Sequence, residues 1–236
     1  EIIKSNLFLR ARSSYDINLA KEDLLKIKSN LKGIGYYFAT VDVYIEELSD
    51  NRINLNYKID LGNKAKIKKI TFIGDKKYKD SKLKNIIISE EYKFWKFISG
   101  KKYLNENLIE FDKRLLKNFY LNKGYYDVNI NSSFAKLLGP DEFEIIYNIN
   151  ANNKFFFNDL KLNLPIDYDV DNFAKINKLF IDLKGESYSL NSVRDIIEEI
   201  EVIVLNEQFE ATKTTVTEEF NSNKINLIFT IDETDK

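Results

Sequence analysis

The sequence lacks histidine, cysteine and methionine altogether among its 236 residues. Without histidine there is no Ser-His-Asp triad and no imidazole metal ligand, and without cysteine there is no thiol nucleophile, disulfide or cysteine-ligated metal site. An enzyme made from this chain would depend on carboxylates, lysine, tyrosine, serine or a bound cofactor. We therefore expect no enzymatic activity, no cofactor and no metal centre. The missing methionine, together with the start at Glu1, predicts a processed or excised fragment.

Net charge and long apolar runs are also scarce. The 37 acidic side chains nearly balance the 36 basic ones, whereas a dedicated nucleic-acid binder normally carries a strongly basic surface. The longest apolar run, 200–205, is interrupted by Glu201 and falls far short of the roughly 20 residues that span a bilayer. We therefore predict neither a nucleic-acid partner nor a transmembrane helix.

The sequence does contain an internal repeat. Gly-Tyr-Tyr occurs at Gly35 and again at Gly124, and the segment 205–211 resembles the residues around Gly124. After each copy, apolar and polar residues alternate, most clearly over 53–60, 143–150 and 225–232. A period of two residues is typical of a strand with one buried face. Three copies in one chain indicate a tandem array of similar units.

A helical pattern precedes each copy, and in the first it consists of Leu24, Ile27, Leu31 and Ile34. Apolar residues recur at helical spacing over 108–119 behind Asn105, and again over 193–204 behind Asn191. Asparagine is a favourable N-cap residue because its side chain accepts a hydrogen bond from the first turn. Both helices are therefore predicted to begin at these asparagines.

Three glycines mark the ends of predicted elements. Gly35 and Gly124 follow the helical pattern, where a helix commonly ends in a left-handed residue that glycine adopts at little cost. Gly74 ends a strand predicted over 67–73 and precedes a short helix predicted over 81–89. Each unit therefore consists of a strand, two helices and two further strands.

These observations predict an α+β fold of tandem βααββ units, each with a three-stranded sheet covered on one face by two helices. Two complete units would occupy 65–152 and 153–236. Residues 1–64 would form a partial unit that lacks its opening strand, because residues 1–3 look like the end of its first helix. Short polar segments would join the units and permit limited hinge motion.

Two motifs that resemble functional signatures have simpler interpretations. The acidic segment 167–171 begins like a calcium-binding EF-hand loop, but Asn172 and Lys178 stand where that loop needs glycine and glutamate. The segment 123–128 approximates an RNA-binding RNP1 pattern, but Asp127 stands where a stacking aromatic residue is required. Helix capping explains the first motif, and a strand with buried aromatic residues explains the second.

The strand after Gly124 is a candidate binding site. It is predicted to lie at an edge of its sheet, where one row of backbone N–H and C=O groups has no partner. Two interpretations stay open: an ordinary edge protected by outward Asp and Asn side chains, or an edge that adds an extended client peptide as a further strand. The candidate edge consists of Asp127, Val128, Asn129, Ile130 and Asn131, and its equivalent in the first unit is 40–44.

Phe94 and Trp95 form a second candidate site. They lie in an apolar loop predicted to follow the short helix of the middle unit. One interpretation is packing within that unit. The other is a partner-docking patch, because large exposed apolar patches mark interaction sites.

A tandem βααββ unit whose second strand opens with Gly-Tyr resembles the POTRA domains of the BamA family, the outer-membrane protein assembly factors. The middle unit carries most of the resemblance, in 72–75, Phe94-Trp95, Gly100, Tyr103 and 121–125. In this alignment residues 1–64 resemble most of the family's second domain, residues 65–152 the third and residues 153–236 the fourth. The third unit departs from the pattern at Leu164 and Gln208, where the middle unit has glycine.

The resemblance implies a location and partners. It implies a non-enzymatic periplasmic part of an outer-membrane protein in a Gram-negative type bacterium, held at the membrane by a C-terminal barrel that is absent from this chain. It implies that unfolded outer-membrane proteins are guided by strand addition and that accessory lipoproteins of the assembly complex dock here. The alternatives are the POTRA region of a TamA-like or two-partner secretion transporter, a purely structural spacer, and a glycosidase that works with carboxylates.

Overall fold

The computed structural model describes residues 6–95, 99–136, 139, 141–206 and 212–233. The chain divides into two compact units, and the boundary between them passes through the middle repeat. The first unit comprises Glu1–Ile73, Tyr78–Arg114 and Asn131–Asn148. The second comprises Gly74–Lys77, Leu115–Ile130 and Ile149–Lys236. Residues 1–3, predicted to end a helix, lie outside the described residues.

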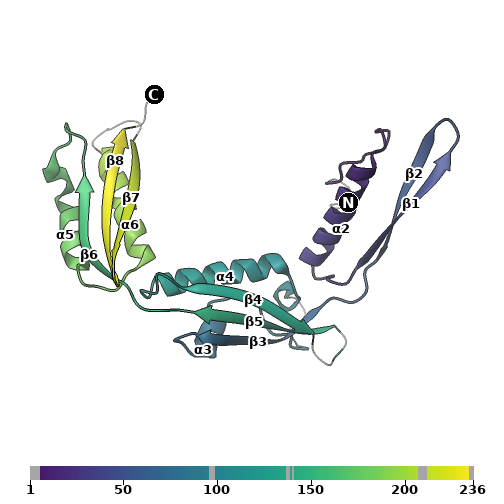
Figure 1. Ribbon diagram of the computed structural model, residues 1–236, viewed down its shortest axis with the longest axis horizontal. Helices are drawn as coiled ribbons and strands as arrows, with labels where there is room; N and C mark the ends of the chain where they lie inside the picture. Colours follow the sequence, from purple (N-terminus) through teal and green to yellow (C-terminus); the bar gives the residue numbers. More distant parts are fainter. Residues whose placement is uncertain (1–5, 96–98, 137–138, 140, 207–211, 234–236) are drawn as a thin grey trace. The chain divides into compact units, whose positions relative to one another are not determined.

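The elements follow one another in the order of the predicted repeat (Figure 1). They are α2 (Ile17–Gly33), β1 (Thr40–Leu48), β2 (Arg52–Asp60), β3 (Lys66–Asp75), α3 (Asp80–Lys84), η1 (Gly100–Lys102), α4 (Glu106–Leu121), β4 (Asn129–Lys136), β5 (Glu142–Asn150), β6 (Phe156–Asn163), η2 (Val170–Phe173), α5 (Ala174–Leu183), α6 (Leu190–Asn206), β7 (Thr212–Asn221) and β8 (Lys224–Glu233). Within the described residues, no helix is long and apolar enough to cross a membrane.

The first repeat consists of α2 beside the antiparallel pair β1–β2 (Figure 1). Helix α2 begins after Asp16, whose carboxylate accepts N–H bonds from Asn18 at 2.7 Å and Leu19 at 3.2 Å. Such an N-cap satisfies backbone donors that the helix itself leaves without a partner. Ile27 and Leu31 of α2 bury their side chains in a small core with residues of the two strands.

The middle sheet has the strand order β3-β5-β4. The alternation predicted for its central strand is confirmed, since Phe143, Ile145, Tyr147 and Ile149 are all buried. Helix α4 begins after Asn105, whose side chain accepts the N–H of Leu108 at 3.2 Å, as expected of an N-cap.

The short helix predicted over 81–89 is wrong in its length, because α3 ends at Lys84. The N–H groups of Ile88 and Ser89 donate instead to the carboxylate of Asp112 on α4, at 2.7 and 3.3 Å. The Asp112 side chain, which is distant in sequence, thus accepts the hydrogen bonds that backbone carbonyl groups would accept in a longer helix.

The third sheet has the order β6-β8-β7, with β6 parallel and β7 antiparallel to β8. Helices α5 and α6 cover one face of this sheet (Figure 1). The core includes the stacked rings of Phe180 and Phe229, whose centroids are 5.5 Å apart. The predicted N-cap of α6, Asn191, is wrong, because the helix begins one residue earlier and Ser189 Oγ accepts the N–H of Ser192 at 3.3 Å.

The first two repeats each bury an aspartate in the helix that precedes Gly-Tyr. The carboxylate of Asp23 accepts the N–H groups of Phe8 at 2.7 Å and Leu9 at 2.9 Å. The carboxylate of Asp112 accepts the N–H groups described above and the hydroxyl of Tyr147 at 2.8 Å. In both repeats the aspartate fixes the chain that leads into the helix, because a buried carboxylate is costly unless its hydrogen bonds are made.

Candidate functional site

Strand β4 lies at an edge of the middle sheet, because β5 is its only neighbour in the order β3-β5-β4. Of the five predicted edge residues, Asn129, Ile130 and Asn131 lie on the strand. Asp127 and Val128 precede it. There the Asp127 carbonyl accepts a hydrogen bond from the Asn152 side chain at 2.8 Å, and the Val128 N–H donates to the Tyr125 carbonyl at 3.3 Å.

The side chains along the start of β4 are mainly polar. Asn129 and Asn131 are exposed and Ile130 is half-buried. This edge therefore offers backbone groups and few apolar contacts to a peptide placed beside it.

Strand β1 is the equivalent edge in the first repeat and has different surroundings. A groove of about 280 Å³ lies between α2 and β1 and is lined by Tyr15, Ile17, Ala20, Lys21, Leu24, Val43 and Ile45. Ile17 on α2 is 56% exposed and Ile45 on β1 is 50% exposed. An open strand edge beside an apolar groove has the two features that peptide strand addition requires.

Sequence reasoning found the β1 edge but missed the groove. Its two walls come from separate elements, α2 and β1, and each wall alone resembles an ordinary core face of a helix or strand. The available signal was Ile17, a large apolar residue at the very start of α2.

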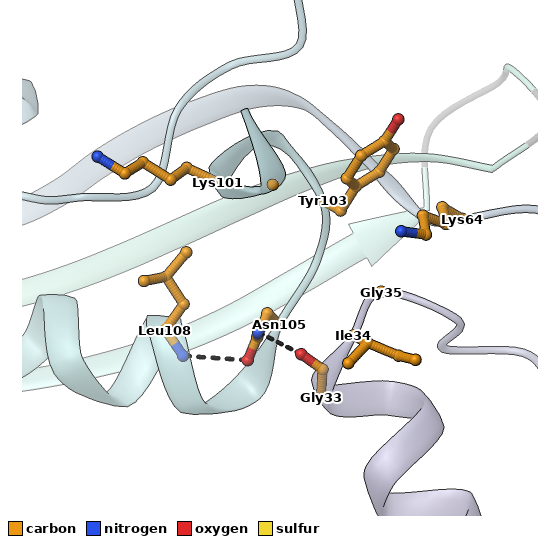
Figure 2. Close-up of a pocket in the computed structure, with 9 residues that line it drawn as sticks. Gly33, Ile34, Gly35, Lys64, Lys101, Tyr103, Asn105 and Leu108 are labelled. Carbon is orange, nitrogen blue, oxygen red and sulfur yellow. Dashed lines mark hydrogen bonds between the residues drawn. The ribbon is translucent and has the colours of Figure 1, made fainter. Parts of the chain in front are cut away.

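Gly35 forms the first junction between repeats (Figure 2). It adopts φ +97° directly after α2, and its carbonyl accepts the N–H of Ala65 at 3.0 Å. A Cβ added at Gly35 would lie 3.1 Å from the Cβ of Tyr103. Figure 2 shows Asn105 between the two repeats, where its side chain accepts from Leu108 and donates to the carbonyl of Gly33.

Gly124 forms the second junction in the same way. It adopts φ +91°, and its carbonyl accepts the N–H of Phe155 at 2.8 Å. A Cβ added there would lie 3.3 Å from the Cβ of Ser187. The bridge between Lys66 and Tyr103 at the first junction has its counterpart between Phe156 and Ser187 at the second. The chain therefore builds one kind of junction twice, and each copy lies within a single compact unit.

The second tyrosine of each Gly-Tyr-Tyr extends into the following repeat. The ring of Tyr126 lies 5.0 Å from that of Tyr188 and 5.1 Å from that of Phe220, and its hydroxyl donates to Glu218. Burial and this hydrogen bond raise the pKa of Tyr126. At the first junction, burial and a hydrogen bond to Glu106 likewise raise the pKa of Tyr37. Aromatic packing therefore contributes to both junctions, in addition to the short polar segments that were predicted to join the units.

The junction geometry predicts that Gly124→Ala destabilises the chain more than Gly185→Ala. Gly185 has a similar φ of +87°, but among the described residues no atom lies within 4 Å of an added Cβ. A left-handed alanine costs about 1–2 kcal/mol at either site, and crowding against Ser187 at Gly124 adds about 1–3 kcal/mol. Urea denaturation of the two variants measures the difference. Equal free energies of unfolding would contradict the close approach at the second junction.

Phe94 and Trp95 lie on the surface and are 72% and 58% exposed. Their rings meet edge to face with centroids 4.7 Å apart. The Nζ atom of Lys93 lies 5.8 Å from the Trp95 ring centroid. The structure thus places both predicted patch residues together and in contact with solvent.

The acidic segment 167–171 serves as a helix cap. The carboxylate of Asp169 accepts the N–H of Asp171 at 3.0 Å and so caps η2. This is the capping role that the sequence predicts for the segment.

Comparisons with known proteins agree with this arrangement. The sequence matches the POTRA family, described as surface antigen variable number repeat, over residues 1–62 and 65–152. The outer membrane protein assembly factor BamA of Neisseria meningitidis serogroup B is 26% identical over 205 residues, which are 85% of this chain and 26% of that protein. BamA of Buchnera aphidicola is 23% identical over 189 residues, which are 78% of this chain and 30% of that protein.

A solved structure shows the same fold. The crystal structure of Haemophilus influenzae BamA POTRA3-5 matches with a TM-score of 0.56 and 12% identity, and the match covers 98% of this chain and 90% of that one. The chain spans less than a third of the length of the two curated relatives. With its α+β repeats and its two equivalent junctions, the chain belongs to the POTRA family, and its sequence is similar to those of BamA proteins.

Proposed function

We propose that this chain is a non-enzymatic scaffold in the periplasm, part of an outer-membrane protein assembly factor that receives unfolded outer-membrane proteins by strand addition. Accessory lipoproteins of the same assembly would dock on its repeats. Family membership and the names of the curated relatives support the assembly role. The observation that carries the binding mode is the open β1 edge beside the apolar groove.

The chemistry of this edge fits an extended and variable client. Backbone hydrogen bonds along β1 would give affinity without dependence on sequence. Alternate side chains of an added strand point to one face, so every second residue of the client would contact the groove walls at Ile17 and Ile45. Strands of outer-membrane barrels alternate apolar and polar residues, which matches a groove that accepts one face of a strand.

Strand β4 would serve as a second, weaker edge. Its exposed Asn129 and Asn131 can hydrogen bond to a client but bury little apolar surface. Because apolar burial contributes roughly 25 cal/mol per Å², the groove beside β1 gives that edge the stronger interaction. We therefore place the principal client site at β1 and keep Asn129 to Asn131 as an auxiliary edge.

Two adjacent proline variants test the client site. In an antiparallel pair, successive residues direct their N–H groups alternately to the partner strand and to the open edge. Tyr44 and Ile45 oppose Asn56 and Leu55 in the β1–β2 pair. One of the variants Tyr44→Pro and Ile45→Pro therefore removes an N–H group that faces the open edge, and the other removes an N–H group that bonds to β2 and so disrupts the pair. We expect the folded proline variant to lose about tenfold or more in affinity for an unfolded outer-membrane protein segment.

Matched alanine variants at positions 44 and 45 are the controls, and far-UV circular dichroism identifies the variant that keeps its fold. Unchanged client affinity in the folded proline variant would remove β1 as the site. A purely structural spacer, or the POTRA region of another transporter class with a different client, would show no binding of this segment even in the unmodified chain.

A further inference from the structure

A short basic loop carries Phe94 and Trp95, the two most exposed aromatic residues among those the structure describes in the middle repeat. Its base is closed by the Glu90 N–H, which donates to the Lys101 carbonyl at 3.0 Å, and by the Tyr92 N–H, which donates to the Ile67 carbonyl at 2.6 Å. Phe94 and Trp95 extend from this base into solvent. The loop is therefore fixed at its base, and its two described aromatic side chains are exposed.

Beyond Glu90 and Glu91 at its base, the loop carries only positive charge. Between Tyr92 and Asn105 the sequence has four lysines and no acidic residue, although the whole chain has a net charge of −1. Lys93 and Lys101 are exposed, whereas Lys102 is buried, with its Nζ atom 5.1 Å from the Tyr92 ring centroid. The surface considered below, the basic aromatic tip, consists of Lys93, Phe94, Trp95 and Lys101.

Two acidic residues lie near this charge. Lys93 and Lys101 border a hollow of about 430 Å³ that also includes Glu90 and Glu91. The carboxylate of Glu91 is held by Lys84 at 2.6 Å and accepts the N–H of Ile70 at 3.0 Å. Lys84 is the cation paired with Glu91, and Lys93 interacts with the same carboxylate more weakly. Three lysines (Lys84, Lys93 and Lys101) and two glutamates line the hollow, so its net charge stays positive towards an external anion.

We propose that the basic aromatic tip binds the surface of an anionic lipid bilayer. Tryptophan and phenylalanine place an apolar ring at the boundary between headgroups and acyl chains. Lysine extends its charged end to anionic headgroups along an apolar stem. Lysine is depleted at protein–protein interfaces, where arginine is the favoured cation. The combination of exposed rings with lysines alone therefore fits a lipid surface better than a protein partner.

Trp95 is the only tryptophan in the chain, so its fluorescence reports on the proposed contact directly. The 236-residue chain is titrated with vesicles of phosphatidylcholine alone and with vesicles that contain phosphatidylglycerol, at low salt and at about 0.5 M NaCl. We expect a blue shift of the emission and flotation with the anionic vesicles at low salt only. High salt shortens the Debye length from about 10 Å at 0.1 M to about 3 Å at 1 M, and so weakens the attraction.

Charge variants identify the residues responsible. Each lysine near an anionic surface contributes about fivefold in affinity, so Lys93→Gln/Lys101→Gln is expected to bind anionic vesicles about 25-fold more weakly. Lys58→Gln/Lys213→Gln removes the same charge from exposed positions on β2 and β7 and is expected to bind as the unmodified chain does.

Three results would overturn the proposal. The first is an unchanged Trp95 spectrum with every vesicle composition. The second is an equal loss of binding in the two double variants. The third is binding of a protein partner that Trp95→Ala abolishes while anionic vesicles stay unbound, because the tip would then be a protein-docking site. None of these results bears on the strand edge of β1, so the proposed function is tested separately.

Discussion

Asp112→Ala is expected to destabilise the middle repeat by about 3 kcal/mol or more. The carboxylate of Asp112 is fully buried and accepts hydrogen bonds from three donors, the N–H groups of Ile88 and Ser89 and the hydroxyl of Tyr147. Each buried donor that loses its acceptor costs about 1–3 kcal/mol. In this variant the N–H groups of Ile88 and Ser89 lose the carboxylate that accepts their hydrogen bonds in place of helical carbonyl groups.

A more conservative variant separates the contribution of the Tyr147 hydroxyl from that of the two backbone N–H groups. Tyr147→Phe removes the hydroxyl alone and is expected to cost about 1.5–3 kcal/mol, since that hydrogen bond joins a charged group. The third repeat carries apolar residues, Ile196 and Phe229, at the corresponding buried positions, which shows that the fold does not require the tyrosine hydroxyl. Urea denaturation followed by circular dichroism measures the free energy of unfolding of each variant. A loss below about 0.5 kcal/mol for Asp112→Ala is the size of an ordinary surface substitution and would contradict the role given to the carboxylate.

Tyr126→Ala is expected to weaken the second junction by about 3 kcal/mol. The variant removes ring contacts with Phe155, Tyr188 and Phe220, and aromatic pairs contribute about 0.5–1.5 kcal/mol each beyond their buried area. Because the contacts join the Gly-Tyr-Tyr turn to the third repeat, the loss should appear as earlier unfolding of that repeat and as faster amide exchange around Gly124. Exchange at Gly35, at the other junction, serves as the internal control and should not change.

Alkaline pH should weaken the same junction. The pKa of Tyr126 is raised in the folded chain by burial and by Glu218 from its ordinary value of 10.0. A raised folded-state pKa stabilises the fold fully below the unfolded value, and this contribution is lost as the pH rises through the folded value. The stability of the unmodified chain should therefore fall above pH 10 more steeply than that of Tyr126→Phe. Burial also raises the pKa of Tyr188 to about 12, which is why the comparison is made between variants that both keep Tyr188.

Period-two and helical patterns predicted most of the fold. Alternation over 143–150 placed β5 and its buried face correctly, because alternate side chains of a strand point to the same face of the sheet. The short helix over 81–89 was predicted too long because its end is set by Asp112, a residue outside the local pattern. The N-cap of α6 was misplaced by two residues for a similar reason, since the Asn191 N–H donates to Asn122 of the preceding repeat.

The candidate site was less predictable than the fold. Gly124 was recognised as a helix end, but its role as a junction depends on Phe155 and Ser187, which are distant in the sequence. The groove beside β1 likewise depends on two elements that meet only in three dimensions. For Phe94 and Trp95 the sequence left packing within the unit and a docking patch both open, because the exposure of a loop side chain depends on what the rest of the fold places beside it.

Amide hydrogen exchange of β1 tests the central claim most directly. The 236-residue chain is compared with and without an unfolded segment of an outer-membrane protein, and the exchange of each amide from Thr40 to Leu48 is measured. We predict protection of alternate amides of β1, because only every second N–H faces the open edge, together with smaller protection on β4. Exchange in β1 that does not change when the segment binds, with protection found elsewhere in the chain, would contradict strand addition at this edge.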